Sequence, residues 1–176
     1  NCNLSIKAIV ALGAFGQLFG EEKYTAIAKD MAARWKLDAK KQNGNGWRLT
    51  FDRDDTWSLK YNMVWDRLLG LDLFGEDVAR EEIAVYAEKM NEYGVPLDSR
   101  ASYTKLDWMA WTTVMADVPE YTKAVYKSMT NMTRDSLDRV PMTDWYDTIS
   151  GSMVGFQHRT VQGGLYMKLL MDNWNK

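Results

Sequence analysis

The feature that most constrains this fold is an alternation between two kinds of helical segment. The odd-numbered segments are apolar or aromatic on most faces, whereas the even-numbered ones are amphipathic with charged outer faces. The expected ranges are 3–19, 21–35, 57–69, 76–90, 103–116, 117–132 and 160–174. Such alternation is typical of stacked helical hairpins with an inner and an outer layer, so we expect an all-α fold with the first helix buried on all sides.

The links between these segments also alternate in length, which predicts where a site lies. Links leaving the inner helices are short, and those returning to them are long and cover 37–56, 91–102 and 133–159. Because successive helices reverse direction, the long links gather at one end of the stack. Loops of this length usually carry function. The single strand signal, at 47–51, predicts a short hairpin arm.

Composition sets the class of protein. A chain of 176 residues predicts one domain over 1–176. The net charge of −2 without runs of like charge argues against nucleic-acid binding. The longest apolar stretch, 8–19, is shorter than a bilayer requires, so we expect no membrane span. One Cys and one His exclude an internal disulfide and a Cys/His zinc set, and we expect no metal and no cofactor.

Two further features concern context. Eight Trp and nine Tyr are more than a core of this size requires and indicate a ligand-facing surface, because both residue types combine an apolar face with a polar group. The chain starts without Met and already within a helical pattern, so we expect it to be a piece of a longer protein.

The first long loop carries an acidic cluster at 52–55. A calcium-binding EF-hand loop is excluded, because the twelfth position is Met63 rather than Glu and the sixth is Trp57 rather than Gly. The alternative is helix capping by Asp55 or Thr56. Further on, Asp66 is expected to pair with an Arg or Lys in a buried, structural role.

The second long loop leads into the fifth helix. Asp98 and Arg100 can pair across a turn, and Lys105 and Asp107 fall near the positive end of the helix, where anions are stabilised. Ser102 and Lys105 have the Ser-x-x-Lys spacing of serine acyl-transferring enzymes. A role for Ser102 as an N-cap explains the same spacing and is the favoured interpretation.

The third long loop places Asp144 and Asp147 on either side of Trp145 and Tyr146. Carboxylates beside aromatic rings are typical of sites for sugars and other polar small molecules. The alternative is that these aromatic side chains close the end of the helical stack. The single histidine, His158, is expected to be structural.

Several blocks along the chain resemble the glutaminase A family, a group of large secreted or periplasmic proteins assigned as L-glutamine amidohydrolases. The matching blocks lie at 57–62, 65–66, 94–100, 103–108, 138–141 and 144–148. The resemblance implies the C-terminal part of such a protein, about half of an (α/α)6 toroid, and a secreted or periplasmic location. Half a toroid leaves inner faces such as Leu4, Ile9 and Phe15 without neighbours, so we expect contacts with the rest of the full-length chain and self-association of the fragment.

The candidate site combines these loops. Asp107 and Asp144 are the candidate catalytic residues, as general base on a water or as an acid–base pair separated by mutual repulsion. Arg100 or Lys105 would hold the substrate α-carboxylate, and Asp98 or Asp144 its α-amine. The full set of candidate substrate-binding residues is Trp57, Lys60, Tyr61, Asp98, Arg100, Lys105, Trp108, Trp145, Asp147 and Arg159.

Three functions remain open from the sequence. The first is hydrolysis of glutamine to glutamate and ammonia by the intact protein, with the isolated fragment inactive. The second is a carbohydrate-active domain that hydrolyses or binds a glycan, which rests on analogy of fold. The third is a folding unit without activity of its own.

Overall fold

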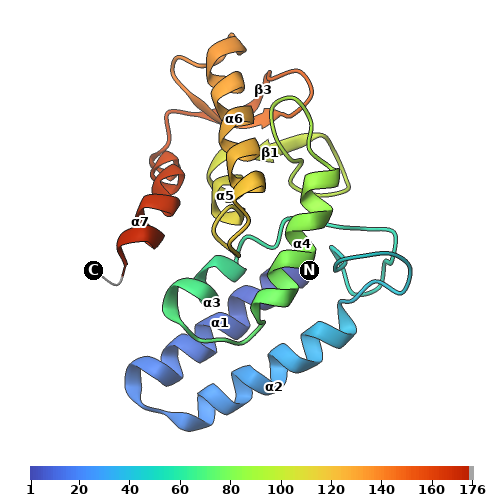
Figure 1. Ribbon diagram of the computed structural model, residues 1–176, viewed down its shortest axis with the longest axis vertical. Helices are drawn as coiled ribbons and strands as arrows, with labels where there is room; N and C mark the ends of the chain where they lie inside the picture. Colours follow the sequence, from blue (N-terminus) through green and yellow to red (C-terminus); the bar gives the residue numbers. More distant parts are fainter. Residues whose placement is uncertain (175–176) are drawn as a thin grey trace.

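The computed structural model describes residues 1–174. Successive helices alternate in direction along most of the chain (Figure 1). The α-helices are α1 (Cys2–Phe19), α2 (Glu22–Asp38), α3 (Met63–Leu69), α4 (Glu76–Glu88), α5 (Leu106–Thr112), α6 (Pro119–Asp135) and α7 (Met167–Asn173). A 3₁₀-helix, η1 (Thr160–Tyr166), leads directly into α7. The prediction of a broadly all-α fold is confirmed.

A small antiparallel sheet joins the second and third long loops, and the sequence did not predict it. Its strands are β1 (Tyr103–Lys105), β2 (Thr143–Asp147) and β3 (Met153–Gln157), in the order β1-β2-β3. Tyr103 is paired with Asp147, and Lys105 with Trp145. The sheet therefore brings residues about 40 positions apart to the same place, next to the start of α5.

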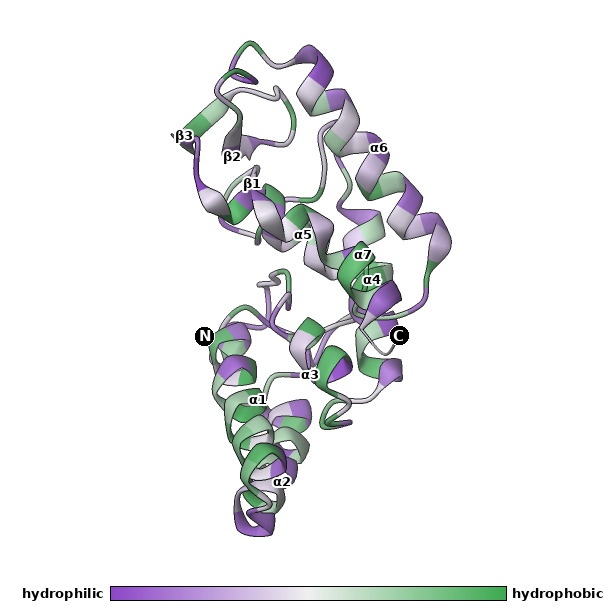
Figure 2. Ribbon diagram, turned by 90° about the vertical axis from the view of Figure 1, so that its left-hand side faces the viewer, coloured by the Kyte–Doolittle hydropathy of each residue, from purple (hydrophilic) through white to green (hydrophobic). Residues whose placement is uncertain are grey.

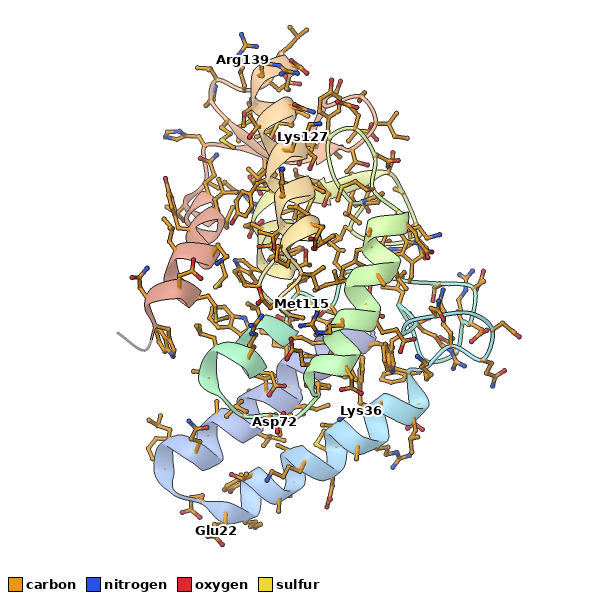
Figure 3. All side chains as sticks on the ribbon, viewed as in Figure 1. Glu22, Lys36, Asp72, Met115, Lys127 and Arg139 are labelled. Carbon is orange, nitrogen blue, oxygen red and sulfur yellow. The ribbon has the colours of Figure 1, made fainter. Side chains whose placement is uncertain are left out.

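The α1–α2 hairpin shows why these residues turn where they do. The side chain of Asn1 accepts a hydrogen bond from the backbone N–H of Leu4 and caps α1. Gly20 ends the helix with a φ of 68°, a left-handed conformation that favours glycine. The far end of the hairpin projects beyond the other helices (Figure 2), and Glu22 at its tip and Arg139 near β2 lie at opposite ends of the long axis (Figure 3).

Aromatic packing joins this hairpin to the rest of the core. The indole N–H of Trp35 donates to the carbonyl of Cys2 at 2.9 Å, and its ring stacks on Trp47 and meets Phe74 edge-on. The first long loop and the start of α4 are thereby packed against α1 and α2.

A buried ionic network fixes the first long loop to α4. The ammonium of Lys60 donates to the carbonyls of Trp47 and Ser58 and lies 3.6 Å from a carboxylate oxygen of Glu82. Tyr86 donates to Glu82 at 2.5 Å and accepts the backbone N–H of Lys60 at 2.7 Å. Lys60 is thus a core residue, and its placement among the substrate-binding residues was wrong.

Several helix boundaries differ from the prediction. The third helix begins at Met63 rather than at position 57, and the fifth at Leu106 rather than at 103. Thr56 is not a helix cap, because its hydroxyl donates to Arg53 and accepts from Leu49 within the loop. The region 47–51 contributes only one isolated bridge, from Trp47, and no strand.

The faces of α1 also differ from the prediction. Ile9 is buried, as are Ile6 and Val10, but Leu18 is 77% exposed and Leu4 and Phe15 are exposed too. The expectation that α1 is buried on all sides was therefore wrong. Leu4 and Phe15 are uncovered, as expected of half a toroid, but Ile9 is covered.

By length and composition α1 could cross a membrane, a test that the core helix of a soluble protein also passes. The helix that forms, Cys2–Phe19, is longer than the apolar stretch 8–19 that was expected. In the structure α1 packs along α2 and α3.

Asp66 lies in a structural position, although its partners are not the expected cations. Its carboxylate accepts the backbone N–H groups of Leu73 and Phe74 at 3.0 Å, which holds the turn between α3 and α4. Backbone amides thus provide the compensation that a buried carboxylate requires.

Candidate functional site

The long loops meet because main-chain hydrogen bonds join them. The backbone N–H of Leu59 donates to the carbonyl of Leu97, and the backbone N–H of Leu97 donates to the carbonyl of Tyr103. The N–H of Ser99 donates to the carbonyl of Trp57 at 3.0 Å. Together with the β1–β2 pairing, these bonds place the loop segments that carry Trp57, Asp98, Lys105, Asp107, Asp144 and Trp145 around the start of α5.

A buried carboxylate with two cations lies at one side of this region. Asp144 is 0% exposed and accepts Arg159 Nε on Oδ1 at 3.0 Å. On Oδ2 it accepts both Lys105 Nζ and Arg159 Nη2. Burial opposes the charge on Asp144, but the hydrogen bonds from Arg159 and Lys105 outweigh it and hold the pKa of this carboxyl below its ordinary value. Asp144 is therefore an ionised carboxylate, and both of its oxygens accept hydrogen bonds from cations.

Asp107 is a contrasting carboxyl on the first turn of α5. It is 4% exposed, and its Oδ1 is buried without a hydrogen-bond partner. Burial raises the pKa of Asp107, the positive charge of Lys105 opposes the rise, and the charge of Asp144 adds to it. Mutual repulsion was expected to raise the pKa of one of the two carboxyl groups; the pKa of Asp107 is raised, but burial is the main cause and the charge of Asp144 contributes least.

Aromatic rings line the space around Lys105. Tyr61 and Trp108 stack with ring centroids 4.4 Å apart, and the Lys105 ammonium lies 5.7 Å from the Trp108 ring centroid. Phe156 completes the group, with its ring centroid 4.9 Å from the same ammonium and 5.2 Å from that of Trp145. Stacked rings beside a cation give an apolar platform with a charged edge.

Phe156 is the main site residue that the sequence did not reveal. It has a φ of 61°, unusual for a residue with a bulky side chain, and its ring also lies 4.0 Å from the guanidinium carbon of Arg159. Strained backbone of this kind clusters at functional sites. His158, two residues later, has a φ of 55°, and its backbone N–H donates to the carbonyl of Met142.

A polar groove continues from the aromatic pair toward the start of α1. Asp98 is buried and accepts Arg100 Nε at 2.8 Å and Nη2 at 2.7 Å, which confirms the predicted pair. The cavity has a volume of about 160 Å³ and is lined by Asn3, Ser58, Tyr61, Asp98, Arg100 and Trp108, among others. Arg100 retains exposed N–H groups that could meet an anion.

Asp147 and Ser102 stabilise the sheet instead of facing this groove. Ser102 donates to Asp147 Oδ2, and the other carboxylate oxygen accepts the N–H groups of Ile149 and Ser150. Although burial opposes it, these hydrogen bonds lower the pKa of Asp147. Ser102 is therefore not a helix cap, since Lys105 occupies the cap position of α5. The ammonium of Lys105 is paired with Asp144, so no bond joins it to Ser102.

No metal site accompanies these groups within residues 1–174, where no three His, Cys, Asp or Glu side chains gather to hold an ion. The groups that gather at the site are carboxyls, cations and aromatic rings. Such a set can bind a small zwitterion or a sugar and can transfer protons.

The fold and the site define a helical-hairpin domain with a polar pocket at its long-loop end. Residues 1–169 match the family model of the glutaminase A six helical-hairpin domain, and the chain belongs to that family. Glutaminase A of Aspergillus oryzae is 29% identical over 181 residues, which cover 96% of this chain and 26% of that protein. A probable glutaminase of Arthroderma benhamiae is 25% identical over 207 residues, which cover 97% of this chain and 24% of that protein.

The chain thus spans about a quarter of the length of these curated relatives. No solved structure matches it.

Proposed function

We propose that this chain supplies the substrate pocket of an amidohydrolase that converts glutamine to glutamate and ammonia. The observation that carries the proposal is the pair of unlike carboxyls beside Lys105. One of them, Asp107, is buried with an unpartnered oxygen, and the other, Asp144, is held ionised by two cations. The similarity to proteins named glutaminase supports the choice of a linear amide as the substrate.

Asp107 carries the proton transfers in this proposal. In its ionised form, its carboxylate takes a proton from a water molecule that attacks the carboxamide carbon; the resulting carboxylic acid then gives that proton to the departing nitrogen. The reaction consumes one water and releases ammonia and a carboxylic acid. A pKa raised by burial suits this role, because it brings the group closer to the working pH.

Asp144 acts as a positioning residue. Its bonds to Lys105 and Arg159 fix both cations beside the aromatic rings, and these three side chains together carry one net positive charge. That charge suits the α-carboxylate of an amino acid. Asp98, in the groove on the other side of the Tyr61–Trp108 pair, is the candidate for the α-amine.

The proposal also concerns the setting of the chain. The remaining part of a full-length secreted or periplasmic protein covers the exposed apolar residues of α1 and completes a toroid. The 176-residue chain alone is then inactive or weakly active, and its exposed faces associate with one another.

The test is an assay of the full-length protein for ammonia release from L-glutamine, run beside an assay for reducing sugar released from a panel of glycans. Ammonia release that depends on Asp107 supports the proposal. Sugar release without ammonia release overturns it in favour of the carbohydrate alternative, which the stacked Tyr61 and Trp108 rings would also suit.

A further inference from the structure

Trp111 is a polar group of the site region that the proposed reaction does not use. It lies on α5 one turn after Asp107, and its indole N–H is buried with no hydrogen-bond partner. Asp107 Oδ1 is unpartnered in the same way. Two unpaired polar atoms on one helix turn are costly to bury, since each loses its hydrogen bonds to water.

Both groups meet the same glycine. A Cβ atom at Gly164 would lie 2.8 Å from Asp107 Cβ and 2.9 Å from Trp111 Nε1. Only a residue without a side chain can approach both groups so closely. A Cβ atom at Gly163, one residue earlier, would meet no other atom within 4 Å.

The segment that carries Gly164 packs along α5 at the surface of the chain. No residue of η1 is buried, and seven residues is long for a 3₁₀-helix. Among residues 1–174, two side-chain hydrogen bonds join it to other elements, from Gln162 to the carbonyl of Met142 and from Tyr126 to the carbonyl of Leu165. Moving η1 outward would break these two bonds and the packing of η1 on α5, and would open the space above Asp107 and Trp111.

We infer that Asp107 and Trp111 form a two-point clamp for a primary carboxamide, with η1 as its cover; this deepens the proposed function and rests on it. The indole N–H can only donate, so it meets the carbonyl oxygen. The carboxyl oxygen of Asp107 accepts from the NH₂ group. The amide nitrogen, which departs as ammonia, then lies against the Asp107 carboxyl that protonates it. The product has a carboxylate in place of the NH₂ group, so it makes only one of the two contacts.

The clamp can be tested by NMR on the full-length protein labelled with ¹⁵N-tryptophan, to which this chain contributes eight indole N–H groups. The Trp111→Phe variant assigns the Trp111 signal by its loss. We expect this signal to move saturably when L-glutamine is added, and to move far less with L-glutamate or with methyl glucoside. Trp111→Phe should weaken glutamine binding about tenfold, the worth of one hydrogen bond.

Trp65→Phe is the matched control, because Trp65 packs edge-on against Trp111 with ring centroids 5.2 Å apart. It removes similar aromatic packing and should leave glutamine binding unchanged. If glutamine leaves the Trp111 signal unmoved, or moves it no more than methyl glucoside does, the clamp is wrong even where the full-length protein releases ammonia. If the signal moves with glutamine but no ammonia is released, the clamp stands and the proposed reaction fails.

Discussion

Replacing Asp144 with Asn tests whether this carboxylate positions the site. The side chain is 0% exposed and Lys105 is 9% exposed, so Asp144→Asn leaves a buried ammonium without its counter-charge. Breaking a buried ion pair costs about 3–5 kcal/mol, and we expect the lower end, about 3 kcal/mol, because the Asn oxygen still accepts one hydrogen bond. For a chain of this length that lowers the thermal midpoint by roughly 6–12 °C.

The pH dependence of this effect has a defined sign. The folded-state pKa of Asp144 lies below the ordinary value of 3.8, so its stabilisation is present above pH 3.8 and is lost as the pH falls through the folded-state pKa. The difference in midpoint between wild type and Asp144→Asn should therefore be full at pH 7 and shrink below pH 3.8.

Asp107→Asn is the matched comparison. The folded-state pKa of Asp107 is raised, so the stability of wild type declines as the pH rises from 3.8 through that folded-state pKa. Asn avoids the buried charge, and the variant should be as stable as wild type at pH 7, or more so. Differential scanning calorimetry at pH 7 measures the thermal midpoints of wild type and of both variants. A normal midpoint for Asp144→Asn with a lowered one for Asp107→Asn would refute the assignment of roles.

Three other predictions follow from the fold. Glu82→Gln, which leaves Lys60 buried without a counter-charge, should lower the free energy of unfolding in urea by about 3 kcal/mol, and an unchanged midpoint would contradict the network. Asp66→Asn should lower stability by about 1–3 kcal/mol without changing turnover in the full-length protein, whereas lost turnover at normal stability would give it a role in chemistry. The chain should associate at rising concentration in sedimentation velocity, and replacing the exposed Leu18 and Phe19 with Ser should reduce association; a wild type that is monomeric throughout would contradict this.

The sequence predicted the order of the helical segments, though not all their ends, because their apolar periodicity is local. It missed the sheet because β1 has only three residues and continues directly into α5, so that 103–116 has the pattern of one helix. The partner of β1, β2, lies about 40 residues further on, and no local pattern reports such a pairing. Ser102 was misassigned for the same reason, since its partner Asp147 lies across that sheet.

The candidate site was predicted as a region more accurately than as a set of roles. The spacing of Asp98 and Arg100 was enough to predict their pairing. Lys60 was misplaced because neighbours in sequence do not report which side of a loop faces the core, where Glu82 lies. Phe156 and Trp111 carry no motif, and their importance follows only from the positive φ of the first and the unpartnered N–H of the second.

The central claim is that Asp107 carries the chemistry of amide hydrolysis. Its most direct test is the rate of ammonia release from L-glutamine by the full-length protein, with wild type and Asp107→Asn compared at equal folded concentration. The account predicts turnover by wild type and a loss of about 10²–10⁴-fold in the variant, the usual contribution of general acid–base catalysis. Near-normal turnover in Asp107→Asn would contradict it.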